Sequence, residues 1–156
     1  MVDVVSSAKR SQMMAGIRGK NTQPELIVRR MLFASGYRFR LHRRDLPGAP
    51  DIVMPSRNVA IFVHGCFWHM HQGCRYAKLP ATRKDFWEAK LLANVTRDRR
   101  AVDELRALGW RVLCVWECAT RDAVTATELQ RTMSLWIEGG ELLGQIGVKT
   151  RECTEG

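Results

Sequence analysis

No part of this sequence is apolar over the length of a membrane span, and its first residues lack both the basic cluster and the apolar stretch of a secretory signal. Internal repeats and low-complexity segments are also missing. We therefore expect a cytoplasmic protein without a membrane-spanning part. A chain of 156 residues with these properties is expected to form one domain, residues 1–156, large enough to bury a core.

Acidic side chains are scarce. Sixteen Asp and Glu stand against 25 Lys and Arg, which gives a net charge of +9 and a pI near 9.9. This balance favours a polyanionic partner such as duplex DNA, RNA or an anionic surface. The five cysteines are expected in a reducing compartment, where metal binding is favoured over a disulfide framework.

The densest cluster of cysteine and histidine follows a run of β-branched and aromatic residues. Cys66 and His71 are separated by four residues there, and His71 and Cys74 by two. Thiolates and an imidazole at such short separations are typical zinc ligands. Tetrahedral zinc needs a fourth ligand, for which the candidates are Cys114 and Cys118.

Two short apolar segments, 51–54 and 59–63, are separated by a turn-forming Pro-Ser-Arg-Asn sequence and predict a β-hairpin. In an antiparallel pair, the start of one strand lies beside the end of the other. The hairpin therefore places the carboxylate of Asp51 near the imidazole of His64. The structural alternative for Asp51 is a carboxylate that caps a turn.

An acid at the start of a strand, in a small basic α/β chain, is where metal-dependent nucleases often hold Mg²⁺, which prefers oxygen ligands. Most such nucleases carry a second acid and a lysine on the next strand. Here that strand ends in Val63 and His64, and residues 59–74 contain neither. A nuclease with this sequence must therefore use histidine for proton transfer.

Helix caps and hydrophobic periodicity complete an α/β pattern. Thr22 and Glu25 form a capping box, and the cap alone explains Glu25. Further helix starts are expected at Thr82 and Thr125. A basic N-terminal arm either packs its methionines on the core or grips nucleic acid. The arm covers residues 1–20, and a weakly patterned tail covers residues 141–156. Helices are expected at 7–20, 22–35, 82–108 and 125–138, and strands at 37–42, 51–54, 59–63 and 110–116.

Several strings in the chain match a known family. The most specific is His-Gly-Cys-Phe-Trp-His at residues 64–69. Further matches are Arg10-Ser11, Met14 and residues 45–51, 80–83, 86–87, 94–95, 97–100, 108–113 and 116–118. On these residues, the chain resembles the very short patch repair (Vsr) endonuclease family over roughly residues 10–137.

This resemblance implies a DNA mismatch endonuclease. Such an enzyme nicks one strand 5′ to the thymine of a T:G mismatch left by deamination of 5-methylcytosine, which initiates very short patch repair. The implied fold is α/β, with a restriction-endonuclease-like core in which helices flank a mixed central β-sheet, and with a structural zinc site. The implied cofactors are a catalytic Mg²⁺ and a structural Zn²⁺. The implied partners are double-stranded DNA with a T:G mismatch and other mismatch-repair proteins, and no membrane is involved. The implied protein is a monomer that acts at the nucleoid in the bacterial cytoplasm.

The resemblance also implies roles for single residues. Asp51 is the Mg²⁺ carboxylate, and Val63 supplies a backbone carbonyl ligand. His69 is the catalytic base and His64 the second active-site histidine. Glu25 corresponds to an acid that supports the metal-bound water or His69. The implied zinc ligands are Cys66, His71, Cys74 and Cys118, and the implied DNA contacts are Met14, Phe67, Trp68 and Trp87.

Two positions depart from the family pattern. Val63 stands where the family usually has threonine, which a backbone ligand tolerates and a hydroxyl ligand does not. Residues 70–74 read Met-His-Gln-Gly-Cys, with one extra residue before Cys74. The sequence therefore leaves the zinc histidine open between His69 and His71.

Two other functions explain part of the sequence. A zinc-bearing DNA-binding protein without catalysis accounts for the charge and the aromatic residues, but not for Asp51, His64 and His69 near one hairpin. A restriction-type nuclease with another target is the third possibility. Phe67 and Trp68 are expected in a loop that cannot readily bury both. For Trp87, on an apolar helix face, a core position is the stronger alternative.

Overall fold

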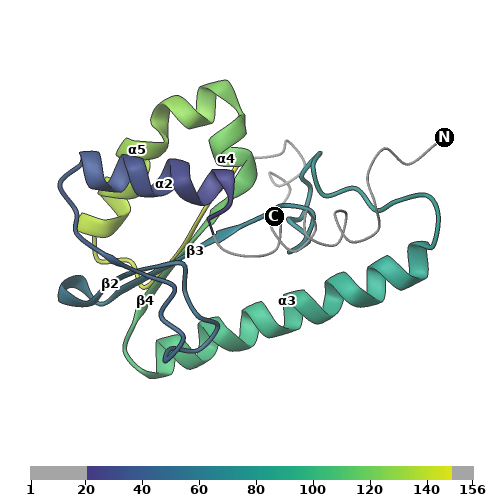
Figure 1. Ribbon diagram of the computed structural model, residues 1–156, viewed down its shortest axis with the longest axis horizontal. Coiled ribbons are helices and arrows are strands. Elements are labelled where there is room, and N and C mark those ends of the chain that lie inside the picture. Colours follow the sequence, from purple (N-terminus) through teal and green to yellow (C-terminus); the bar gives the residue numbers. More distant parts are fainter. Residues whose placement is uncertain (1–20, 149–156) are drawn as a thin grey trace.

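Helices cover both faces of a five-stranded sheet in the computed structural model, which describes residues 21–148 (Figure 1). The strand order is β1-β2-β3-β4-β5, with antiparallel β1–β2 and β2–β3 pairs and parallel β3–β4 and β4–β5 pairs. In the described range, no helix is long and apolar enough to cross a membrane. The strands are β1 (Arg40–Leu41), β2 (Ile52–Met54), β3 (Val59–His64), β4 (Arg111–Trp116) and β5 (Leu143–Ile146), and the helices are α2 (Gln23–Ala34), η1 (Pro55–Arg57), α3 (Lys84–Ala107), α4 (Glu117–Arg121) and α5 (Ala123–Glu138).

The predicted hairpin forms between β2 and β3, with Ile52 opposite Ile61. Strand β3 then pairs with the parallel strand β4, and its last residue, His64, lies beside Trp116. These two strands are almost entirely buried, which explains why their sequences are continuously apolar rather than alternating. Because β3 and β4 are parallel, their C-terminal ends lie side by side, and both strands lead directly into candidate site residues.

The two faces of the sheet bury separate cores. Helices α2, α4 and α5 lie over one face and α3 runs along the other, with its N-terminal part extending beyond the sheet (Figure 1). Ile61 faces the first core, beside Leu32 and Met133, whereas Ala60 and Phe62 face α3. This alternation is the two-residue period of a strand covered on both sides.

The structure differs from the sequence prediction at two helix starts and at one expected loop. Thr82 does not cap α3, which begins after Arg83 in a left-handed conformation with a φ of 55°. Helix α5 is capped by Asp122, whose carboxylate accepts the N–H of Thr125 at 2.9 Å, so the helix starts earlier than predicted. A further short helix, α4, follows β4 where a loop was expected. Aspartate is as good a cap as threonine, and local composition could not rank them.

The strand predictions at the two sheet edges also need correction. The predicted strand 37–42 contracts to β1, because only two residues pair with β2. Part of the weakly patterned tail forms β5, which pairs with β4. Leu143 in this strand is exposed, because β5 lies at the edge of the sheet. The strand therefore lacks the alternation of apolar and polar residues that marks a strand in the sequence. The predicted N-terminal arm, including Met14, lies outside the described residues.

Candidate active site and metal centre

One cavity of about 590 Å³ collects residues from four parts of the chain. It lies at the C-terminal end of β3 and is closed by residues from α2, from the loops flanking β1 and β2, and from α3. Carboxylate and imidazole side chains line this cavity. The side chains that form the candidate site are those of Glu25, His42, Asp51, His64, His69 and Asp98.

Asp51 precedes β2 and lies opposite the end of β3, as the hairpin predicted. Its Oδ2 accepts the backbone N–H of Val63 at 2.7 Å. Burial raises the pKa of Asp51 to about 6, the bond from Val63 opposes the rise, and the charge of Glu25 adds to it. The half-buried Asp51 carboxylate offers oxygen donors that a hard divalent cation prefers, so this end of the cavity fits Mg²⁺.

Two of the histidines that line the cavity stack on each other. The rings of His64 and His69 stack with centroids 3.9 Å apart and an interplanar angle of 7°. Burial lowers the pKa of His64 to about 3, and the neighbouring His69 lowers it further. His64 is therefore neutral at physiological pH, and its Nδ1 lies 3.2 Å from Sγ of Cys114.

Asp98 on α3 is the partner of His69. Its Oδ2 lies 2.5 Å from Nδ1 of His69, and each side chain is about a quarter exposed. We assign Nδ1 as the donor, which leaves Nε2 as the proton acceptor. Sequence reasoning missed Asp98, although it is the single acid within the arginine-rich run 97–100. Only the packing of α3 against the loop after β3 revealed its role.

Glu25 does more than cap α2. Its backbone N–H is bound by Oγ1 of Thr22 at 3.4 Å, as the capping box predicted. Its carboxylate, however, is buried inside the cavity wall, accepts the N–H of Asn21 at 2.6 Å and pairs with Arg29 at 2.9 Å. It also contacts Nε2 of His42. Among the described residues, the carboxylate contacts these three and not His69.

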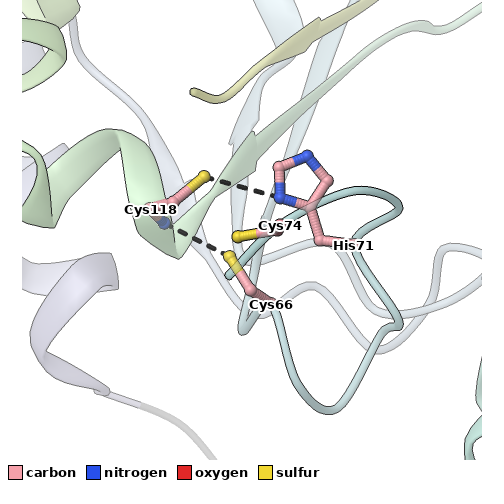
Figure 2. A group of neighbouring side chains, drawn as sticks. All are labelled: Cys66, His71, Cys74 and Cys118. Carbon is pink, nitrogen blue, oxygen red and sulfur yellow. Dashed lines mark hydrogen bonds between the residues drawn. The ribbon is translucent and has the colours of Figure 1, made fainter. Parts of the chain in front are cut away.

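A second cluster of ligating side chains lies outside the set of residues that line the cavity. Three residues come from the loop after β3 and one from α4, and the four side chains point toward a common centre (Figure 2). Their ligand atoms all lie within 4.8 Å of one another. Four protein ligands form a closed coordination shell that could hold a metal ion in a structural role. The members are Cys66, His71, Cys74 and Cys118.

The cluster distinguishes the alternatives that the sequence left open. His71 faces the thiols, with Nδ1 3.4 Å from Sγ of Cys118, whereas His69 faces Asp98. Cys114 lies within β4, and burial raises the pKa of its thiol. In contrast, Cys118 lies in the cluster, where the hydrogen bond from the Cys66 thiol lowers the pKa of Cys118 and raises that of Cys66. The position of Cys118, rather than its pKa, selects it as the fourth candidate ligand.

The expected DNA-contacting aromatics form one cluster. The ring centroids of Phe67 and Trp87 are 5.7 Å apart, and those of Trp68 and Trp87 are 6.0 Å apart. Trp68 is only 8% exposed whereas Phe67 is half-buried, so the loop does not bury both aromatics, as expected. Trp87 is half-buried rather than a full core residue, and Phe86 beside it is exposed.

A basic α/β protein with a buried carboxylate, two stacked histidines and a carboxylate-bound imidazole in one cavity has the arrangement of a phosphodiester-cleaving hydrolase. Comparison with known proteins agrees. The sequence profile described as DNA mismatch endonuclease Vsr matches residues 2–75. The chain belongs to this family and is an endonuclease.

Full-length relatives extend the match beyond the profile. The chain is 54% identical over 122 residues to the type II nicking enzyme V.XorIIP of Xanthomonas oryzae pv. oryzae, covering 78% of this chain and 89% of the relative. It is 43% identical over 148 residues to the DNA mismatch endonuclease Vsr of Escherichia coli, covering 94% of each. The type II nicking enzyme V.NmeAIP of Neisseria meningitidis is 38% identical over 128 residues, covering 82% and 91%.

Proposed function

We propose that this endonuclease nicks one strand of duplex DNA 5′ to the thymine of a T:G mismatch, in a Mg²⁺-dependent reaction that initiates very short patch repair. The observation that supports the chemistry is the convergence of Asp51, His64 and His69 on one cavity. The mismatch specificity is inferred from the family resemblance. The mixed sheet with its site at the end of a hairpin agrees with a restriction-endonuclease-like core.

Asp51 and the backbone carbonyl of Val63 would hold the Mg²⁺. When bound, this ion neutralises phosphate charge and stabilises the leaving oxygen. Val63 serves through its carbonyl, so the replacement of the family's threonine is tolerated. The backbone N–H of Val63 already binds Asp51, which fixes the carboxylate at this position.

His69 acts as the general base in this proposal. Asp98 accepts a hydrogen bond from the Nδ1–H of His69. This bond orients the ring and leaves Nε2 free of a proton, so that Nε2 can accept one from the attacking water. His64 stacks on this ring and stays neutral, so it does not repel the imidazolium formed at His69. Glu25 contributes negative charge beside Asp51, which supports a cation and its bound water.

The cluster of Cys66, His71, Cys74 and Cys118 would hold a structural Zn²⁺. Three thiolates and one imidazole are a common structural zinc set, and four protein ligands leave no open position for catalysis. The metal would fix the backbone of Phe67, which follows Cys66 directly. Phe67 and Trp87, backed by the buried Trp68, would then insert beside the mismatch, where unstacking costs least.

We further propose that a single-domain monomer acts on DNA in the bacterial cytoplasm, where it contacts other mismatch-repair proteins. Its N-terminal arm, with Met14, would grip the duplex. The charge of +9 supports binding to the phosphate backbone. An anionic backbone is shared by every duplex, so this charge supplies affinity and not the choice of site.

A nicking assay tests the proposed function. End-labelled duplexes with a T:G mismatch, another mismatch or a matched pair are incubated with and without Mg²⁺. We expect a single nick 5′ to the thymine, only in the T:G duplex and only with the metal. Nicking of a matched duplex at a fixed sequence would instead support the restriction-type alternative, and binding without nicking would contradict the catalytic site.

A paired substitution tests the aromatic wedge. Phe67→Ala should lower the ratio of mismatched to matched binding, because it removes the partly exposed ring that reaches the duplex. Trp68→Ala should lower the ratio as well and should also reduce thermal stability, since Trp68 is 8% exposed. Binding titrations with both duplexes measure the ratio. If neither change alters it, the aromatics are packing residues.

A further inference from the structure

Arg29 and His42, which the proposed mechanism does not use, form a polar cluster with Glu25. Nη2 of Arg29 lies 2.9 Å from Oε1 of Glu25 and 3.3 Å from Nε2 of His42. Nε2 of His42 contacts the same Glu25 oxygen. The three side chains are 15%, 13% and 2% exposed, in the order Arg29, His42, Glu25. Charged groups buried to this extent require partners, and here they partner each other.

The backbone of His42 also pairs with the backbone of Asp51. His42 follows β1 directly and has a φ of 48°, a left-handed conformation that is uncommon for a residue other than glycine. In this conformation its N–H donates to the carbonyl of Asp51 at 3.1 Å. One residue therefore contacts Glu25 through its ring and Asp51 through its backbone.

The two carboxylates lie close to each other, with His42 beside both residues. Ligand atoms of Glu25, His42 and Asp51 all lie within 4.8 Å of one another. Like charges at such a distance repel, and each carboxylate would move if nothing held it. His42 and Arg29 supply the donors that hold Glu25, and the Asp51 backbone is held by the pairing with His42.

We propose that His42, supported by Arg29, is a positioning residue that fixes the Glu25 and Asp51 carboxylates relative to each other and thereby sets the affinity of the cavity for its divalent cation. The inference rests on the proposed Mg²⁺ site at Asp51. Substitution of a residue that hydrogen-bonds to a metal ligand typically changes metal affinity or activity by about 10–100-fold, and we expect an effect of this size.

Two amide substitutions separate the ring contact from the backbone conformation. In His42→Gln, the amide nitrogen extends about as far as Nε2 of histidine and can still donate to Glu25. In His42→Asn, the amide is one bond shorter and does not reach, although asparagine tolerates the left-handed backbone well. Arg43→Asn is the matched control, because the neighbouring Arg43 pairs with the exposed Asp45 and not with this cluster.

Two measurements report on the cation. Binding of Mn²⁺ to the DNA-free, zinc-loaded protein is followed by electron paramagnetic resonance, with Asp51→Asn defining the loss of this site. The half-saturating Mg²⁺ concentration, kcat and the KM for the T:G duplex are measured by nicking. For His42→Asn, we expect about 10–100-fold weaker Mn²⁺ binding and a matching rise in the Mg²⁺ requirement, with the KM for DNA unchanged. His42→Gln and Arg43→Asn should behave like the unsubstituted protein.

Equal Mn²⁺ affinity and equal Mg²⁺ requirement in His42→Asn would overturn the inference. So would equal losses in His42→Asn and His42→Gln together with lower thermal stability, since that result indicates a purely structural histidine. If His42→Asn does not fold, Arg29→Gln must weaken Mn²⁺ binding in its place, or the inference fails. If the unsubstituted protein binds Mn²⁺ at Asp51 but does not nick T:G duplexes, the proposed function fails while the Mn²⁺ comparison still decides the role of His42.

Discussion

The cavity and the cysteine-histidine cluster come within two residues of each other in the sequence, at His64 and Cys66, yet they are built on opposite principles. The cavity is open and gathers carboxylates and imidazoles from distant parts of the chain. Its buried groups are incompletely compensated, so the pKa of Asp51 is raised and the pKa of His64 is lowered. The cluster is compact, with three of its four ligands from one loop and a complete ligand set.

This difference shows how one loop can serve two purposes. A closed metal site stabilises the fold, because the binding free energy of the metal is available only to the folded chain. A site that must accept substrate retains buried charges without full partners, at a cost in stability. A metal bound by the cluster would hold rigidly the segment that carries Phe67 and His69.

The largest effect should come from breaking the closed site. Cys118→Ser is expected to lose the metal and most of the folding stability, because structural zinc contributes on the order of 10 kcal/mol in small domains. Cys114→Ser is the control, since Cys114 is not one of the four cluster residues and its Sγ lies 3.2 Å from Nδ1 of His64. Metal analysis and thermal unfolding measure both. Full zinc in the Cys118 variant would contradict the proposed ligand set.

Removing the hard-cation ligand should abolish catalysis without affecting the other site. Asp51→Ala is expected to lose detectable nicking, because Asp51 is the carboxylate proposed to hold Mg²⁺. Mismatch binding and zinc content should remain nearly unchanged. Single-turnover nicking and duplex titrations measure this separation. Substantial Mg²⁺-dependent nicking by the variant would remove Asp51 from the mechanism.

The proposed base should have a smaller effect. His69→Ala is expected to lower the nicking rate by about 10²–10⁴-fold, the range for a lost general base. Zinc content should not change, because His69 contacts Asp98 and His71 faces the thiols. Asp98→Asn should lower the rate less, since it keeps a side chain of the same shape beside the ring. Loss of zinc in the His69 variant would show that the roles of His69 and His71 are exchanged.

The buried charge of Asp51 should be measurable in the Mg²⁺-free protein. Its folded pKa of about 6 exceeds the ordinary value of 3.8, so its contribution to stability is fully present below about pH 4 and is lost as the pH rises through 6. At about 1.4 kcal/mol per pKa unit, the loss reaches at most about 3 kcal/mol. Urea unfolding between pH 4 and 8 should show this loss, and Asp51→Asn should remove it. An identical pH profile in the variant would contradict the raised pKa.

The smallest predicted effect distinguishes two exposed arginines of α3. Arg97 lines the catalytic cavity, whereas Arg100 is outside it and pairs with Glu104. Arg97→Ala should weaken matched and mismatched duplexes equally and reduce the slope of log affinity against log salt by about one. Arg100→Ala should leave the slope unchanged. Titrations at several salt concentrations measure it, and equal slopes for both variants would contradict a phosphate contact from the cavity rim.

The sequence by itself determined the features that local chemistry specifies. Ligand spacing marked Cys66, His71 and Cys74, and hairpin topology placed Asp51 beside the end of β3, as the structure shows. These inferences succeeded because short-range geometry constrains residues that are close in the chain. The local signals were weaker at element boundaries, where Asp122 rather than Thr125 caps α5.

Only the tertiary structure decided which distant residues meet. Asp98 reaches His69 across 29 positions of sequence, and His42 reaches Glu25 across 17. Strand β5 has no alternating pattern of its own, and its pairing with β4 defines it. Each of these contacts depends on how helices pack on a sheet, which no periodicity within a single segment encodes. The sequence therefore specified the chemistry available to this protein, and packing selected the partners that position it.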